Sequence, residues 1–143
     1  MGYKPYKIRR LKLFKNYEIR FVWKIFPVLV EYKEMEDWGR AFTFRIEVNR
    51  HLSGWEKEIT IAHELTHIKQ NLVEKLTFGI RKKWWVYKEL EAYVESLKIV
   101  PPYERDYYMR LMASGMAKHL YLDEDYAYKL LKSKVEPTTS EMM

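Results

Sequence analysis

The chain of 143 residues contains no cysteine, which excludes disulfide scaffolds, thiolate zinc fingers and a cysteine nucleophile. Long apolar runs are also missing: the longest covers residues 25–30, too short to span a bilayer. The first six residues hold neither an apolar signal core nor the Ser or Thr of a myristoylation site. We therefore expect a cytoplasmic protein whose partners do not include a membrane.

Amide side chains are also few: Gln70 is the sole glutamine, and there are three asparagines. Few amides, no cysteine and 32% charged residues form a composition typical of thermophile proteins, although chance bias in a small chain would look the same. With 48% hydrophobic residues, the chain is long enough to bury one core. We expect a single domain over residues 1–135 and a disordered tail at 136–143.

The net charge of +6 is concentrated at the amino-terminal end. Residues 1–24 contain eight Lys or Arg and one acid, Glu18. The basic residues within 4–24 could contact nucleic acid or another anionic surface. A strand with a solvated basic face explains the same pattern, because Lys and Arg alternate with apolar residues there.

The hydrophobic pattern predicts a block of strands followed by helices. A period of two predicts strands over residues 6–14, 17–26, 28–32 and 42–48. The first expected helix has a capping box at Ser53 and Glu56 and ends near Gly79; three more cover residues 84–98, 104–119 and 124–132. This order predicts an α+β fold, in which a small twisted sheet of about three or four strands packs on two site-bearing helices, with extra carboxy-terminal helices.

The first expected helix carries the motif His63-Glu64-Leu65-Thr66-His67. Residues four apart lie on one helix face with Cβ atoms about 6 Å apart. Two imidazoles so placed can bind one zinc ion at about 2.0–2.1 Å each. Glu64 projects about 100° around the helix, beside the metal, where it can take a proton from water and pass it on. The alternative is an amphipathic helix with two histidines by chance; composition gives this pentapeptide in roughly one such chain in a few hundred, so the motif favours zinc.

A catalytic zinc needs a third protein ligand, and the next helix offers Glu89, Glu91 and Glu95. If Leu90, Val94 and Leu97 form its buried side, Glu91 and Glu95 flank that side four residues apart, and Glu89 falls toward the opposite edge. We therefore predict Glu91 as the ligand and Glu95 as the acid that accepts the free N–H of a zinc-binding histidine. An ordinary charged helix edge is the alternative.

Other candidates carry weaker signals. Hydrolysis through a tetrahedral intermediate needs a donor that stabilises the oxyanion, and Tyr87, one turn before Glu91, is the first candidate. Ordinary packing explains such side chains equally well; the further candidates are His119, Tyr107 and Tyr108. His51 is expected to be structural. Residues 81–85 mix bases with aromatic rings as single-strand binders do, but we expect a solvated helix start with two tryptophans packed inward.

The two motifs together resemble the gluzincin metallopeptidases. Those combine an HExxH helix with a later Glu ligand followed by an acid four residues on, here Glu91-Ala92-Tyr93-Val94-Glu95. The 24-residue gap from His67 to Glu91 resembles the single-domain minigluzincins and the SprT-like or phage-like minimal proteases. The resemblance covers residues 38–98. It departs from the larger members in having Glu95 where Asp is usual, and in lacking the large carboxy-terminal helical domain.

This resemblance implies a zinc metallopeptidase, a hydrolase with one catalytic Zn2+. His63, His67 and Glu91 would bind zinc, Glu64 would be the general base and acid, and Glu95 would orient a ligand. The strand at 42–48 would be the sheet edge that pairs with an extended peptide.

The resemblance also leaves alternatives open. Residues 101–143 could cover the cleft of a latent protease, form a specificity wall, or simply pack, which we rank first. The alternatives in function are a DNA-associated SprT-like protease and a catalytically silent zinc-binding interaction protein.

Overall fold

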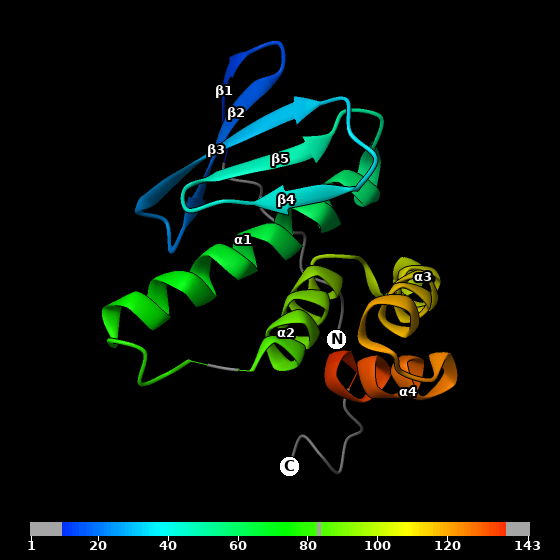
Figure 1. Cartoon of the computed structure of the whole chain (residues 1–143). Helices are drawn as coiled ribbons and strands as arrows, with labels where there is room; N and C mark the ends of the chain where they lie inside the picture. Colours follow the sequence, from blue (N-terminus) through cyan, green and yellow to red (C-terminus); the bar gives the residue numbers. More distant parts are fainter. Residues whose placement is uncertain (1–9, 83, 137–143) are drawn as a thin grey trace.

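The computed structural model describes residues 10–82 and 84–136 and has the expected α+β fold (Figure 1). A five-stranded sheet precedes four helices. Among the described residues, no helix combines the length and hydropathy that a membrane span requires. The predicted tail lies outside the described residues except for Glu136. The elements are β1 (Arg10–Phe14), β2 (Tyr17–Val22), β3 (Phe26–Lys33), β4 (Gly39–Ala41), β5 (Arg45–Asn49), α1 (Gly54–Leu76), α2 (Trp85–Lys98), α3 (Pro102–Leu120) and α4 (Glu124–Val135).

The sheet has the strand order β1-β2-β3-β5-β4. β3 and β5 are parallel, and the other neighbours are antiparallel. The expectation that the strand at 42–48 forms the sheet edge is therefore wrong, because β5 lies between β3 and β4. The edge is the three-residue β4, which folds back on β5 and is too short to show an alternating pattern.

The sheet packs on one face of α1 and forms the first hydrophobic core. Ile61, Leu65 and Ile68 of α1 are buried against the apolar side of the strands, as the helical spacing predicts. Ser53 is the residue before the helix, as expected, but its side chain makes no capping hydrogen bond, so the predicted capping box does not form. The strand residues in this core are Val22, Val28, Val30, Ile46 and Val48.

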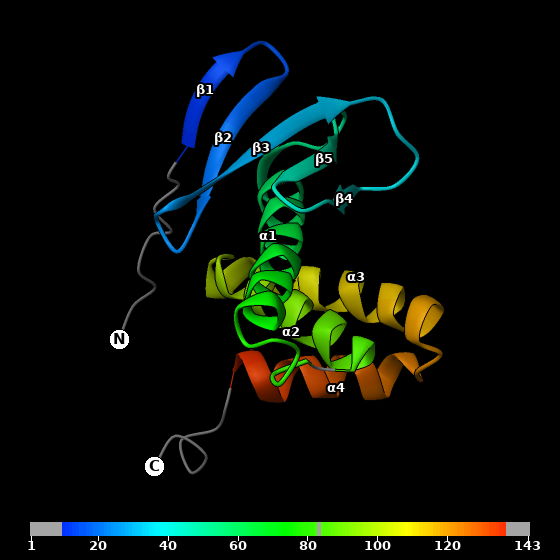
Figure 2. The same ribbon diagram turned by 60° about the vertical axis from the view of Figure 1, so that its left-hand side comes forward.

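A second core joins α2, α3 and α4 to the amino-terminal part of α1. Figure 2 shows these three helices gathered at the end of the molecule opposite the sheet. Ile59 of α1 is buried in this second core, whereas Ile61, Leu65 and Ile68 belong to the core under the sheet. The packing role ranked first for residues 101–143 is confirmed for α3 and α4, whose buried residues include Met109, Met116 and Leu131.

A buried ion-pair network ties the sheet to α1. The Arg20 guanidinium donates to both carboxylate oxygens of Glu58 on α1 at 2.9 and 3.0 Å, and to Glu18 at 3.1 Å. All three side chains are almost fully buried, and the Tyr32 hydroxyl also donates to Glu18. Arg20, one of the basic residues proposed to contact nucleic acid, is therefore buried in an internal ion-pair network. Residues 4–9 of that basic segment lie outside the described residues.

Candidate functional site

His63 and His67 occupy successive turns of α1, and their rings converge. Their Nε2 atoms are 3.2 Å apart, and the ring planes meet edge to face. Two nitrogen ligands that bind one tetrahedral zinc at 2.0–2.1 Å lie about 3.3 Å apart. The two histidines therefore already have the separation that a shared zinc ion needs.

Glu89 of α2 completes a triangle with the two histidines. Its Oε1 lies 2.9 Å from His67 Nε2, and its Oε2 lies 3.3 Å from His63 Nε2. Both ring nitrogens and the carboxylate thus face one small space between α1 and α2. The set of two imidazoles and one carboxylate is a ligand combination found in catalytic zinc sites, which keep the fourth position open.

The prediction that Glu91 lies beside the histidines is wrong. Its Oε1 accepts a hydrogen bond from Gln70 Nε2 at 2.7 Å, and its side chain lines a separate cavity of about 380 Å³. Glu95 is also misplaced as a partner of a histidine, since it is half-exposed and pairs with Lys98 at 3.1 Å. The position four residues after Glu89 is taken by Tyr93, whose ring centroid lies 4.6 Å from that of His63.

The error has a physical cause in the packing of α2. That helix is enclosed by α1 on one side and by α3 and α4 on the other. Ala92 and Ser96 are consequently buried as fully as Leu97, with Val94 beside them. The positions of the apolar side chains alone therefore do not show which face of α2 is directed at α1. For this reason the prediction placed Glu91, and not Glu89, beside the histidines.

Gln70 holds His67 in position, a role that the sequence analysis missed. Its Oε1 lies 2.9 Å from His67 Nδ1, while its Nε2 donates to the Lys88 carbonyl at 2.9 Å and to Glu91. When Nδ1 donates to Gln70, His67 Nε2 faces Glu89 and the shared space. A protonated Nε2 donates to Glu89 there, and a deprotonated one offers its lone pair to a metal. The available signal was a unique glutamine three residues after His67 on the same helix.

Glu64 lies beside this triangle in a buried position between α1 and β4. The side chain is 8% exposed, and its carboxylate shares a cluster with His63 and His67 whose ligand atoms all lie within 4.8 Å. Burial raises the pKa of Glu64, although the nearby His63 and His67 act against this shift. A carboxylate whose pKa is raised in this way is a better proton acceptor than an exposed one.

The pKa of Glu89 is lowered, whereas those of His67 and Tyr93 are raised. Burial opposes the charge of Glu89, but hydrogen bonds with His63 and His67 prevail and hold the pKa of Glu89 far below its usual range. Burial likewise opposes a charged His67, but its bond with Glu89 prevails and raises the pKa of His67. Burial, together with the charges of Glu89 and Glu64, raises the pKa of Tyr93 to about 12, so its hydroxyl stays protonated.

Close contact between β4 and α1 depends on Gly39. A Cβ atom at this position would lie 2.6 Å from Thr60 Cγ2 and 3.1 Å from the Glu47 carbonyl oxygen. It would also lie 3.5 Å from Glu64 Cγ. The missing side chain thus lets the edge strand approach the helix beside Glu64.

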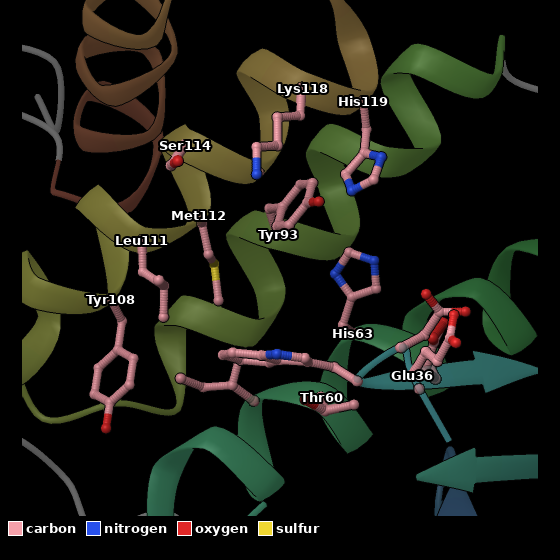
Figure 3. A pocket seen from close by; sticks show the side chains of 16 residues that line it. Glu36, Thr60, His63, Tyr93, Tyr108, Leu111, Met112, Ser114, Lys118 and His119 are labelled. Carbon is pink, nitrogen blue, oxygen red and sulfur yellow. The ribbon is translucent and has the colours of Figure 1, made fainter. Parts of the chain in front are cut away.

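A cleft of about 510 Å³ opens next to the histidines, and α3 forms its far wall (Figure 3). In the close-up His119 lies across from His63, and the Lys118 amine extends into the space. Part of the segment 101–143 thus lines the cleft, and the specificity-wall role considered for it stays a prediction. The lining residues are Glu36, Asp37, Trp38, Gly39, Ile59, Thr60, His63, Glu64, Tyr93, Tyr108, Leu111, Met112, Ser114, Gly115, Lys118 and His119.

The structure separates the candidate oxyanion donors. Tyr108 and His119 line the cleft, whereas Tyr87 and Tyr107 are not among its lining residues and are 59% and 66% exposed. The first choice, Tyr87, instead contacts the Trp84 ring at a centroid distance of 5.8 Å. Tyr87 was predicted because it lies one turn before Glu91, so the wrong rotation assumed for α2 misplaced both residues.

Two remaining expectations have different outcomes. His51 is exposed and pairs with Glu34 at 2.7 Å, which agrees with a structural role. The expectation that Trp84 and Trp85 pack inward is wrong, because their side chains are 63% and 51% exposed.

Comparison of the chain with protein-family models, with curated proteins and with solved structures finds no match. The function is therefore inferred from the site itself.

Proposed function

We propose that the protein is a zinc-dependent peptidase in which His63, His67 and Glu89 hold the metal. The observation that carries the proposal is the convergence of His63 Nε2, His67 Nε2 and the Glu89 carboxylate within 2.9–3.3 Å of one another. That spacing matches ligands on a shared tetrahedral ion. Zinc bound there would polarise a peptide carbonyl and make water acidic enough to lose a proton near neutral pH.

Glu64 is the general base of this proposal. Its buried carboxylate lies beside the histidines and faces β4, and its raised pKa suits it to accept a proton from the attacking water. The same carboxyl group would then deliver that proton to the leaving amine. Side chains that line the cleft and can donate a hydrogen bond to the oxyanion include the two earlier candidates, Tyr108 and His119, and also Tyr93 and Lys118.

The substrate class follows from the edge strand beside the site. β4 pairs with β5 on one side only, and Trp38 and Gly39 at its start line the cleft. An extended peptide can add to such an edge through main-chain hydrogen bonds, which fix its backbone without demanding a sequence. A peptide bound along β4 would cross the cleft next to Glu64.

This proposal keeps the HExxH part of the gluzincin resemblance and departs from the rest at two positions. The ligand is Glu89 in place of Glu91, and Tyr93 stands where those enzymes have an acid four residues after the ligand. No described contact favours the DNA-associated alternative. The catalytically silent alternative shares the metal site and differs only in hydrolysis.

The test of this proposal is Glu64→Gln. The variant should keep one zinc per chain, because Glu64 is not among the three proposed ligands, and should lose nearly all cleavage of an unfolded protein substrate. Metal analysis and digestion, followed by mass spectrometry, measure the two properties. Glu56→Gln, which changes a half-buried glutamate earlier in α1, is the matched control and should retain both. Undiminished cleavage by Glu64→Gln would refute the mechanism, and zinc binding without any cleavage by the unaltered protein would favour the silent alternative.

A further inference from the structure

The connection between α1 and α2 exposes an unusual number of large apolar side chains. We name the set Leu76, Phe78, Ile80, Trp84 and Trp85 the apolar tip; its members are 66%, 94%, 85%, 63% and 51% exposed, respectively. In Figure 1 this connection forms the lower left extremity of the molecule, away from the sheet and from α3 and α4. Side chains of this kind normally lie inside, and such a group marks an interaction site.

The backbone at Phe78 strengthens this point. Phe78 has φ of 52°, in the left-handed region where Gly or Asn is favoured and a bulky side chain is rare. Its ring is nevertheless 94% exposed, so it contributes almost nothing to the interior. Neither the backbone conformation nor packing in the interior therefore explains an aromatic residue at position 78.

The charged residues of the connection itself are all basic. No acidic residue occurs in the sequence between Glu74 and Glu89. Lys88 pairs with Glu74, but within the described part of the chain no carboxylate pairs with Lys75, Arg81 or Lys82. Three cations beside exposed apolar side chains form a surface complementary to something both negative and apolar.

We propose that the apolar tip binds the surface of an anionic lipid bilayer. Phe78, Ile80 and the two tryptophans would enter the boundary between headgroups and acyl chains, while Lys75, Arg81 and Lys82 contact lipid phosphates. Tryptophan rings favour this boundary region. This mode of binding needs no spanning helix, so it agrees with the finding that no described helix can span a bilayer. It departs from the expectation that a membrane is not among the partners. It does not depend on zinc or on peptidase activity.

The aliphatic members distinguish a bilayer from single-stranded nucleic acid. Aromatic rings and cations alone would suit both partners, because bases stack on aromatic rings. Leu76 and Ile80 offer no ring for stacking, yet they are among the most exposed apolar residues of the chain. A hydrocarbon boundary accepts them, and their burial there contributes to binding.

The orientation of the bound protein follows from α1. His63 precedes Leu76 by 13 residues along this helix, or about 20 Å at 1.5 Å per residue. A bilayer that holds the apolar tip would leave the cleft about that far along the helix from the surface, accessible from the aqueous side.

Flotation with vesicles tests the proposal on the full-length protein. Vesicles of phosphatidylcholine with about one-third phosphatidylglycerol should bind the protein, and vesicles of phosphatidylcholine alone should bind it much less. Arg81→Gln with Lys82→Gln should weaken binding roughly 30-fold, or about 5-fold per charge. Phe78→Ser with Ile80→Ser should weaken it by at least about tenfold. Circular dichroism should show the same folded state for every variant.

Matched controls lie on α3 and α4. Tyr121→Ser removes another aromatic ring that is 90% exposed with φ of 56°, and Lys132→Gln with Lys134→Gln removes two exposed charges from α4. Both controls should bind vesicles as the unaltered protein does. Vesicles of brominated lipid should quench tryptophan fluorescence, and Trp84→Phe with Trp85→Phe should remove most of that quenching.

Several results would overturn the proposal. These are no binding to either vesicle type, equal binding to both, or an equal loss in the Tyr121→Ser control. Sedimentation equilibrium that shows a dimer converted to a monomer by Phe78→Ser with Ile80→Ser would instead assign the apolar tip to a second copy of the chain. Binding of single-stranded DNA that is lost in Trp84→Ala but retained in Ile80→Ser would assign it to nucleic acid.

Discussion

Replacement of Glu89 by alanine should remove zinc from the protein, whereas Glu91→Ala should leave most of it bound. Glu89 is the carboxylate that touches both His63 Nε2 and His67 Nε2. Structural zinc sites with about four ligands gain roughly 10–16 kcal/mol, so one ligand contributes about 2.5–4 kcal/mol. Glu89→Ala should therefore weaken zinc binding by about two to three orders of magnitude.

The expected effect of Glu91→Ala is smaller because its contact with the site is indirect. Glu91 holds the amide of Gln70, but that amide also donates to the Lys88 carbonyl at 2.9 Å and keeps that restraint in the variant. We expect a loss within about tenfold. Gln70→Ala removes the partner of His67 Nδ1 itself and should cost about 10- to 100-fold.

Competition with a fluorescent chelator gives the zinc affinity of each variant, and circular dichroism verifies its fold. The reasoning predicts the order of loss Glu89→Ala, then Gln70→Ala, then Glu91→Ala. A full equivalent of tightly bound zinc in Glu89→Ala, or a greater loss in Glu91→Ala, would show that the metal is held elsewhere on α2.

Three further changes test the frame of the site. Gly39→Ala should destabilise the protein by about 1–3 kcal/mol, because its Cβ meets Thr60 Cγ2 at 2.6 Å; chemical denaturation should show partial recovery when Thr60→Ser removes that methyl group, and no recovery would refute the clash. Arg20→Met should cost about 3–5 kcal/mol, because it removes the guanidinium partner of the buried Glu58 carboxylate and one of the partners of buried Glu18. The exposed Arg110→Met should cost much less, and equal melting temperatures for the two variants would contradict this. Truncation after Pro101 should give insoluble protein in expression trials, since it removes α3 and α4 from the second core; a soluble truncation with raised peptidase activity would show instead that the segment covers the cleft.

The helices were predictable because their information is local. The apolar spacing on α1 and the residues around Ser53 predicted a helix near residues 54–79, and the structure has Gly54–Leu76. The two prolines after Val100 separated α2 from α3 as expected. The sheet order was not predictable in this way. The parallel pairing of β3 with β5 and the edge position of β4 depend on contacts between segments far apart in the chain.

In the candidate site, too, the residues on one helix were predictable and the residue contributed by a second helix was not. His63, Glu64 and His67 share one helix, so their spacing alone fixes their arrangement. The choice between Glu89 and Glu91 depends on how α2 is rotated about its axis, and α2 is enclosed on several sides. A rotation inferred from Leu90, Val94 and Leu97 could not account for the burial of Ala92 and Ser96, which have weak apolar character.

The sharing of α1 between two cores has a thermodynamic consequence. Ile59 belongs to the helical core, and Ile61, Leu65 and Ile68 belong to the core under the sheet. Because α1 contributes to both, the loss of α1 structure in one core removes buried contacts from the other. The chain should therefore unfold cooperatively, as one unit, despite having two cores. His63 and His67 lie on the same shared helix. A ligand that binds them only in the folded state shifts the unfolding equilibrium of the whole chain by mass action, so both cores would melt together at a higher temperature.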